Sequence, residues 1–331
     1  MILASVTTYG DWTPPQLSFH GGDLDNLINI IHVFMAFLFV PWLLFYLFCL
    51  NHYRQRPGHG AKYEPIKAKI SKYAEIGVII FEAILLVGFS TPAWAKYKNE
   101  PPAAKDRLEI HVIAQQFQWN FHYAGKDGIF GRTDASKITA SNPIGLDDTD
   151  PNAKDDIVTI NDFHIPTNKD IYVRITSKDV IHSFDIPTMR VKQDAIPGME
   201  IPIWFKVDPK ATSASLIEQM SMTVPIEEAD WYRIRHFVTA EDYSGKGDGF
   251  PKKGDSVGDT REKGEKLLER MKKAGVTQLK LQPEHALEVV CSQLCGNSHF
   301  KMKASMTTHD EAGFEQWMKD QFKKPEGAQE F

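Results

Sequence analysis

Residues 27–50, LINIIHVFMAFLFVPWLLFYLFCL, contain no Asp, Glu, Lys or Arg. A helix of this length rises about 36 Å, which is enough to cross a hydrocarbon layer about 30 Å thick. The stretch therefore predicts a transmembrane helix. Because charged residues make up 24% of the whole chain, most of the protein must lie in water, and this helix anchors a larger polar part.

A second apolar run, residues 74–94 (AEIGVIIFEAILLVGFSTPAW), is long enough for another membrane helix but carries Glu75 and Glu82. At 3.6 residues per turn, two side chains seven positions apart lie on nearly one face, roughly 10 Å from each other along the helix. Carboxyl groups inside a membrane face partner helices or polar paths rather than lipid. The stripe therefore indicates either hydrogen bonds between helices or a route for protons.

The loop between the two runs, residues 51–73, predicts the orientation of the chain. Residues 1–26 contain no Lys or Arg, whereas the loop contains Arg54, Arg56, Lys62, Lys67, Lys69 and Lys72. Cytoplasmic loops carry such an excess of basic residues. We therefore expect a protein of the bacterial inner membrane, with the loop in the cytoplasm, and with residues 1–26 and everything after Trp94 in the periplasm. The first residues lack the features of a secretory signal, so insertion is expected to rely on the first helix.

The exported part after Trp94 is mildly acidic. The six basic and six acidic residues before it cancel, so the net charge of −5 falls on the exported part. This balance argues against nucleic acid as a partner and is compatible with a basic docking protein.

Of the three cysteines, Cys49 lies in the first apolar run. Cys291 and Cys295 remain as a pair for a disulfide or a metal site in an oxidising compartment.

The exported domain begins with residues 108–123, LEIHVIAQQFQWNFHY, in which alternating apolar positions lead into an aromatic-rich stretch typical of a β-strand. Shorter apolar runs follow between Pro, Asn, Asp and Gly residues, at 157–160, 171–175, 182–186 and 203–207. The pattern predicts an all-β domain over residues 95–331, built as a sandwich or a barrel.

Two segments of this domain lack the strand pattern. Residues 124–156 are predicted as a loop, and their acidic run DDTDPNAKDD is interpreted as a solvated surface. A long insertion at about 209–282 interrupts the strands. Within it, residues 259–274 are predicted as a helix, with Asp259 and Glu262 as a capping box at its start.

The segment CSQLCGNSHFKM, residues 291–302, places two thiols, an imidazole and a thioether within twelve residues: Cys291, Cys295, His299 and Met302. Thiolate and thioether ligands favour copper, and imidazole suits it well. Two cysteines can also bridge two metal ions, each of which then needs its own imidazole. The second imidazole must come from elsewhere, and His182, at the start of a predicted strand, is a candidate.

Simpler interpretations of these residues remain. A Cys-x3-Cys pair taken alone is more often a disulfide or half of a zinc site, although zinc would not need Met302. His182 taken alone would more often be an ordinary packed or surface histidine. Asp179 and Asp185, which flank His182, could belong to an acidic docking surface or be solvated carboxylates.

Five features in this order resemble cytochrome c oxidase subunit II: the two apolar helices, then QFQWNFHY, ITSKDVIHSFDIPTM, VKQDAIPGM and CSQLCGNSHFKM. The resemblance covers most of the chain. It implies a membrane-anchored all-β fold, in which a two-helix transmembrane hairpin precedes a cupredoxin-like sandwich or barrel with the long insertion. It also implies a dinuclear copper centre, CuA, in that domain.

The resemblance implies that His182, Cys291, Cys295, His299 and Met302 bind copper through their side chains, and Gln293 through its backbone carbonyl. The family usually has Glu at the position of Gln293, where the carboxylate helps to hold magnesium or manganese at the contact with subunit I. Glutamine has no charge, which puts this second metal site in doubt.

The implied function is transfer of electrons from cytochrome c to a haem of subunit I, where oxygen is reduced to water and protons are pumped. This chain would carry electron transfer only, and haems would lie only in the partner. Phe117 occupies the position of the family's electron port, usually Trp. Trp119, on the same face of a strand, could serve as the port or as core. Glu75 resembles the acid at the start of a proton path into subunit I.

The insertion is the main departure from the family, which usually has about a third as many residues between His182 and Cys291. We expect the additional residues, 209–282, to contact a further oxidase subunit.

Three other classes of protein have related features. A quinol oxidase subunit II lacks the copper ligands, nitrous oxide reductase does not need the membrane hairpin, and a membrane-anchored copper carrier would deliver metal rather than electrons.

Overall fold

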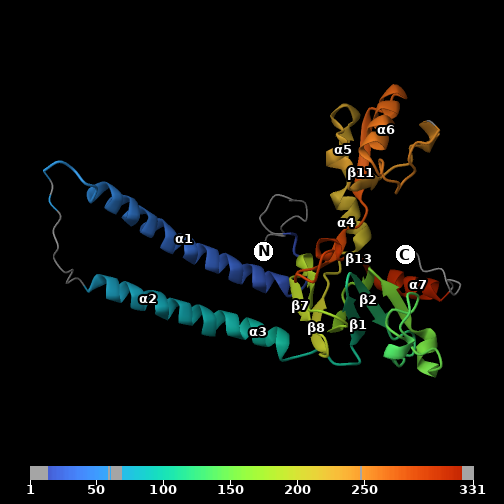
Figure 1. Ribbon diagram of the computed structural model, residues 1–331, viewed down its shortest axis with the longest axis horizontal. Coiled ribbons are helices and arrows are strands. Elements are labelled where there is room, and N and C mark those ends of the chain that lie inside the picture. Colours follow the sequence, from blue (N-terminus) through green and yellow to red (C-terminus); the bar gives the residue numbers. More distant parts are fainter. Residues whose placement is uncertain (1–13, 59, 61–68, 247, 323–331) are drawn as a thin grey trace. The chain divides into compact units, whose positions relative to one another are not determined.

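The computed structural model describes residues 14–58, 60, 69–246 and 248–322 (Figure 1). The chain divides into two compact units, one formed by His20–Pro101 and the other by the described residues before and after it. Lys62 and Lys67, on which the predicted orientation partly depends, lie outside the described residues, as do residues 1–13.

The first unit consists of long apolar helices. Two spans, Gly21–His52 and Ile70–Ala95, are long and apolar enough to cross a membrane. The second span is continuous but changes its winding, and a π-helical segment separates two α-helical parts. The elements are α1 (Gly21–His52), α2 (Ile70–Ile84), η1 (Leu85–Ser90) and α3 (Thr91–Lys98). Phe34 of α1 stacks on Phe81 of α2 at 3.9 Å between ring centres.

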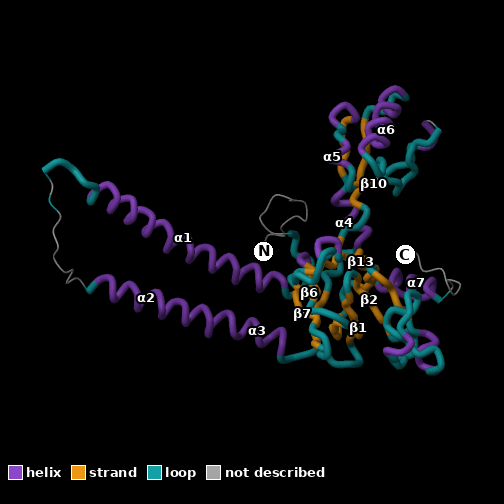
Figure 2. Tube along the Cα trace, in the orientation of Figure 1, coloured by secondary structure: helices purple, strands orange, loops and turns teal. Residues whose placement is uncertain are grey.

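The second unit contains two five-stranded sheets (Figure 2). One has the order β3-β2-β1-β5-β8 and the other has the order β4-β13-β12-β6-β7. The strands are β1 (Arg107–Gln115), β2 (Gln118–Tyr123), β3 (Ile157–Ile160), β4 (Asp162–Pro166), β5 (Asp170–Ser177), β6 (His182–Ile186), β7 (Val191–Ala195), β8 (Ile201–Lys206), β12 (Leu287–Cys291) and β13 (Lys303–His309). Helix α7 (Glu311–Gln321) follows the last strand. The predicted fold class, two apolar helices followed by a cupredoxin-like β-domain, is confirmed.

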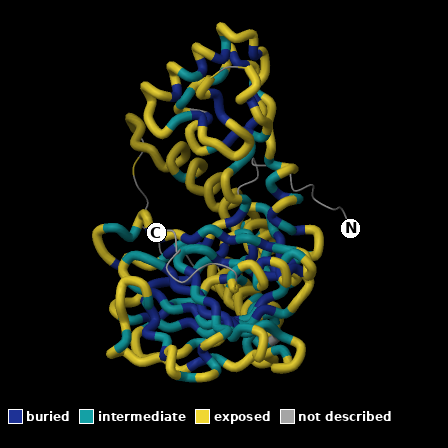
Figure 3. Tube along the Cα trace, turned by 90° about the vertical axis from the view of Figure 1, so that its right-hand side faces the viewer, coloured by how far each residue is buried: buried dark blue, intermediate teal, exposed yellow. Residues whose placement is uncertain are grey.

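The inner faces of the two sheets form one hydrophobic core. Alternate residues of β2 point inward, so Trp119, Phe121 and Tyr123 are almost completely buried. Phe121 stacks on Phe163 at 4.6 Å between ring centres, and Trp119 meets Phe184 edge to face at 5.5 Å. Full burial of one such aromatic side chain contributes about 2–3 kcal/mol to folding. Figure 3 shows buried segments of this unit in dark blue.

The prediction of one strand over residues 108–123 is wrong. The segment forms an antiparallel hairpin in which Gln115 pairs with Gln118, and Gln116 and Phe117 form the turn. Phe117 and Trp119 therefore do not share a strand face. The alternation of apolar residues resumes on the far side of the turn, and the turn contains none of the Gly, Pro, Asn or Asp residues that usually mark one.

Interpreting the acidic run as a solvated surface is also wrong for much of loop 124–156. The Asp156 side chain is 0% exposed, and its Oδ2 lies 2.6 Å from Nε2 of buried His122 on the outer face of β2. The Asp155 carboxylate accepts an N–H from Lys126 at 2.6 Å. These contacts fasten the loop over the outside of the first sheet.

The insertion has a core of its own. Its three-stranded sheet has the order β10-β11-β9, and its elements are α4 (Ser213–Met220), β9 (Met222–Pro225), α5 (Trp231–Ile234), β10 (Phe237–Thr239), α6 (Arg261–Lys273) and β11 (Gln278–Pro283). Leu268, Met271, Leu279 and Leu281 are buried in a cluster separate from the core of the large sheets. The predicted capping box of α6 is wrong: Thr260 caps the helix and accepts the N–H of Lys263.

A short segment before α1 also belongs to the β-domain. The Leu17 N–H donates to the Thr188 carbonyl at 2.9 Å, and the Asp208 N–H donates to the Leu17 carbonyl at 2.9 Å. Leu17 is only 4% exposed. The sequence pattern did not predict this addition, because two or three residues are too few for a strand signal.

Candidate metal centre

The candidate ligands come from neighbouring strands of the second sheet. His182 is the first residue of β6, and Cys291 is the last residue of β12. These strands are antiparallel, with Cys291 opposite Phe184, so their ends bring the two residues together. The loop from β12 to β13 then returns Cys295, His299 and Met302 to the same place.

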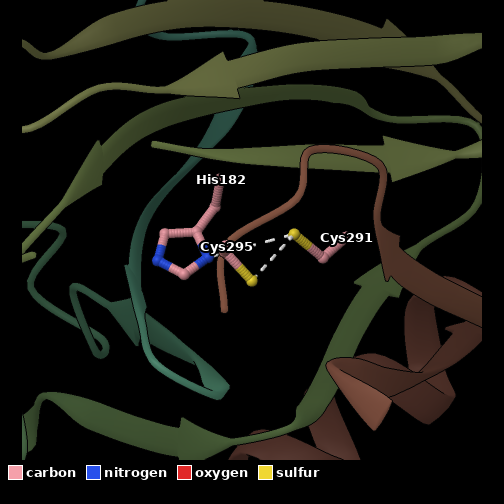
Figure 4. Close-up of side chains that lie close together, drawn as sticks. All are labelled: His182, Cys291 and Cys295. Carbon is pink, nitrogen blue, oxygen red and sulfur yellow. Dashed lines mark hydrogen bonds between the residues drawn. The ribbon is translucent and has the colours of Figure 1, made fainter. Parts of the chain in front are cut away.

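The two thiols and one imidazole form a compact group (Figure 4). The Sγ atoms of Cys291 and Cys295 are 3.8 Å apart. Nδ1 of His182 lies 3.9 Å from Sγ of Cys291, and one ligand atom from each of the three residues lies within 4.8 Å of the others. All three residues are buried, and His182 is 0% exposed.

Three further donor atoms surround the sulfurs. Nδ1 of His299 and Sδ of Met302 lie 3.5 Å and 3.7 Å from Sγ of Cys295. The carbonyl oxygen of Gln293 lies 3.2 Å from Sγ of Cys291. The structure therefore brings together every residue that the sequence singled out as a ligand.

The two thiols differ in acidity. Burial tends to raise the pKa of Cys291, but hydrogen bonds from His182 and from the Ser183 backbone outweigh it and lower the pKa to about 6. Burial and the neighbouring charge of Cys291 raise the pKa of Cys295 to about 12. Without a metal, the pair therefore holds one thiolate and one thiol near neutral pH, and a bound cation has to displace the Cys295 proton.

Asp179 orients His182 rather than facing solvent alone. Its Oδ1 lies 2.9 Å from Nε2 of His182, which leaves Nδ1 directed to the cysteines. Its Oδ2 accepts the backbone N–H of Gln116 at 2.7 Å, and the Gln116 side chain donates to the Cys295 carbonyl at 2.5 Å. Sequence reasoning missed both roles, although the spacing of three residues between Asp179 and His182 was a signal. Asp185 accepts a hydrogen bond from the Ser292 hydroxyl beside the centre.

The donor set fits copper better than the alternatives. Cys291 and Cys295 are free thiols at a separation too long for a disulfide. A zinc site would be complete with four thiolate and imidazole ligands, whereas here a thioether that is 1% exposed also faces the sulfurs. Buried thiolates, imidazoles and a thioether are the ligands of copper sites that transfer electrons.

The candidate port residues lie at different depths. Phe117 is partly exposed in the hairpin turn and lies against the backbone of Gly296, where an added Cβ would come within 2.9 Å of its ring. Trp119 is 0% exposed, and its ring centre lies 6.2 Å from that of His182. Glu75 and Glu82 are exposed on α2, in the helical unit.

Comparison with known proteins gives consistent matches. The family model described as cytochrome c oxidase subunit II, periplasmic domain, matches residues 108–215, which include His182 but end before Cys291. The alternative cytochrome c oxidase subunit 2 of Bradyrhizobium diazoefficiens is 33% identical over 196 residues, which cover 59% of this chain and 69% of that protein. A probable cytochrome c oxidase subunit 2 of Rickettsia conorii is 31% identical over 152 residues, covering 45% of this chain and 46% of that protein.

A solved structure, the periplasmic domain of subunit II of cytochrome oxidase of Bradyrhizobium japonicum, is also similar. It is 20% identical, with a TM-score of 0.32, and the match covers 68% of this chain and 98% of that one.

Proposed function

The chain belongs to the cytochrome c oxidase subunit II family, and we propose that it accepts electrons from cytochrome c at a dinuclear copper centre and passes them to a haem of subunit I. It is a membrane-anchored subunit of an oxidoreductase. The observation that carries the proposal is the convergence of four further donor atoms, from His182, Gln293, His299 and Met302, on two cysteine sulfurs 3.8 Å apart.

Cys291, Cys295, His182, His299 and Met302 would hold the copper through their side chains, and Gln293 through its backbone carbonyl. When bound, a copper pair would supply a one-electron carrier in which the change of charge is shared by two ions. The protein contributes burial, which excludes water, and two strand ends that hold the ligands in place. Both limit rearrangement when the charge changes.

The proposed path into the centre runs through the hairpin turn. Phe117 is its partly exposed end, and the adjacent Gln116 side chain donates to the Cys295 carbonyl, so a short covalent route with one hydrogen bond connects the surface to the Cys295 sulfur. Trp119 has no exposed surface, so it is better suited to packing against His182 from the core side than to receiving electrons at the surface.

The remaining parts of the proposal concern the complex. Reduction of oxygen to water, the haems and proton pumping belong to subunit I and the other oxidase subunits. We place the loop between the helices in the bacterial cytoplasm and the copper domain in the periplasm. Gln293 has no carboxylate, so we expect no magnesium or manganese ion to depend on its side chain.

Glu75 is proposed as the start of a proton path into subunit I. An oxidase carrying Glu75→Gln should lose proton uptake and turnover, and Glu82→Gln on the same helix serves as the comparison. Unchanged uptake and turnover in the Glu75 variant would assign the residue to contacts between helices.

We further propose that the insertion contacts an additional oxidase subunit. Tyr232 is 51% exposed, and the Arg235 and Arg261 guanidinium groups lie 5.8 Å and 5.0 Å from its ring centre. Tyr and Arg are the residues most often found at the centre of protein interfaces. A photo-crosslinker at Tyr232 should capture one oxidase subunit in intact membranes, and a crosslinker at Lys210 serves as the control.

Metal analysis of the purified full-length chain tests the central proposal. We expect two coppers per chain and an electron paramagnetic resonance spectrum in which one unpaired electron is shared equally by both nuclei. A single isolated copper, or zinc, would contradict the dinuclear assignment. Rapid loss of copper to a weak chelator would favour a copper carrier.

A further inference from the structure

A second polar site lies on the outer face of the first sheet. A cavity of about 240 Å³, partly open to solvent, lies between this face and loop 124–156. Its floor includes Arg174 and Thr176, on the outward side of β5, and Lys178, directly after the end of that strand, and its cover includes Ile138 and Ile144. The lining contains none of the metal ligands.

Lys178 brings an uncompensated positive charge to this cavity. Its ammonium donates to the side-chain carbonyl of Gln115 and to the backbone carbonyl of Pro143, both of which are neutral. No carboxylate forms an ion pair with it in the described part of the chain. An ammonium has three N–H groups, so one remains for a ligand. Burial lowers the pKa of Lys178, and the nearby Asp179 charge opposes this effect from outside hydrogen-bonding distance.

The other charges around the cavity are already matched. Nε of Arg174 lies 2.6 Å from Glu109, and its Nη1 lies 3.5 Å from Glu200. Arg107 also contacts Glu109, at 2.6 Å. Among the residues that line the cavity, Arg174 and Lys178 are cationic and Glu200 is anionic, which leaves an excess of one positive charge at the cavity itself. This excess selects a monoanion, because a dianion would leave one negative charge unmatched in a partly buried site.

The rest of the lining indicates the shape of the ligand. Ile113, Ile138, Ile144 and Ala135 provide an apolar wall, and Thr176 adds a hydroxyl to the lining. An anion that carries a short hydrocarbon chain would satisfy both ends of the cavity, whereas inorganic phosphate would leave the isoleucines facing water. We propose that this cavity binds a short-chain aliphatic monocarboxylate, with the carboxylate on Lys178 and the chain against the isoleucines.

The test uses the full-length chain in detergent and butanoate as the probe, with binding followed by saturation-transfer nuclear magnetic resonance. We expect butanoate to bind and its neutral analogue, butanamide, to bind much more weakly. Lys178→Met keeps the length of the side chain but removes the charge, and should weaken butanoate binding by about tenfold. Lys210→Met, at an exposed site in the insertion, should leave binding unchanged.

A second variant tests the contribution of the apolar end of the cavity separately from that of the charged end. Ile138 is 44% exposed, so Ile138→Ser should fold while weakening butanoate binding several-fold and leaving acetate binding less affected. Equal binding of butanoate and butanamide, or no loss in the Lys178 variant, would rule the site out. Phosphate that binds more tightly than butanoate would show that the assigned ligand class is wrong.

Discussion

Nε2 of His182 lies 2.9 Å from Oδ1 of Asp179, while Nδ1 of the same ring lies 3.9 Å from Sγ of Cys291. One carboxylate thus decides which nitrogen of this imidazole is presented to the sulfurs. Asp179 is itself held by the backbone N–H of Gln116. The hairpin turn, the carboxylate and the ligand therefore form one connected unit, in which the carboxylate acts through His182 and not on a metal directly.

Replacement of Asp179 by Asn should lower copper affinity by about tenfold, because carboxylates behind metal-bound histidines typically contribute that much or more. Competition with a copper chelator on the full-length chain measures the affinity. The matched control is Asp148→Asn, whose side chain is 92% exposed. Equal affinities in the two variants would remove the orienting role.

Met302→Leu should retain two coppers, because the cysteines and histidines remain. The reduction potential should rise, since the variant loses a donor to the oxidised state and the surroundings become more apolar. Voltammetry of the copper-loaded chain measures the potential. Met306→Leu, in strand β13 that begins directly after Met302, is equally buried and is the control for a change of packing. A loss of copper would show that the thioether is needed for binding itself.

His309 should make folding sensitive to acid. Burial and the charge of His164 lower its pKa to about 4, although the carboxylates of Asp310 and Asp162 oppose the shift. The unfolded chain, with a histidine pKa of 6.5, therefore binds more protons between pH 6.5 and 4. The contribution of neutral His309 to the free energy of unfolding is fully present above this window. It falls by about 2 kcal/mol as the pH drops through the window, after allowance for partial exposure.

Urea unfolding of the full-length chain at several pH values measures this dependence. His309→Gln should flatten it, and exposed His285→Gln should leave it unchanged. An equally steep pH dependence in the His309 variant would place its origin elsewhere in the domain.

Gly264→Ala should loosen the insertion without disturbing the metal centre. A Cβ at Gly264 would lie 2.0 Å from Cδ1 of Trp231, whose indole N–H donates to the Gly258 carbonyl at 3.0 Å. Overpacking of this kind costs about 1–3 kcal/mol. Because the insertion has a separate core, proteolysis should become faster there while copper content stays constant.

The control for this variant is Gly245→Ala, in the same insertion, where an added Cβ meets no atom within 4 Å. Loss of copper in the Gly264 variant, with the control unchanged, would show that the insertion supports the centre directly.

Hydropathy was sufficient to predict both long helices, and two strands, Ile157–Ile160 and His182–Ile186, have the bounds that the pattern predicts. These signals are local, so a single segment contains them. The hairpin turn at Gln116 and Phe117 was missed because an apolar alternation resumes directly after it. The contacts that the loop aspartates make were also missed, because their partners, such as His122, are distant in sequence.

The candidate metal centre brings together residues that are far apart in the sequence. His182 and Cys291 are 109 positions apart, and only the pairing of β6 with β12 brings them together. The twelve-residue motif predicted four ligands, and the need for a second imidazole made His182 a candidate for the fifth, which the family resemblance then implied as well. Asp179 could have been proposed from its spacing to His182. The role of Gln116 could not, because it follows from the hairpin turn.

The strand-like addition of Leu17 between Thr188 and Asp208 has a consequence for biosynthesis. Residue 17 leaves the ribosome long before its partners, which are made after both long helices. At a synthesis rate of about 5–20 residues per second, it waits roughly 10–40 seconds for them. The earliest described segment of the chain can therefore pair with the β-domain only after both long helices have been made.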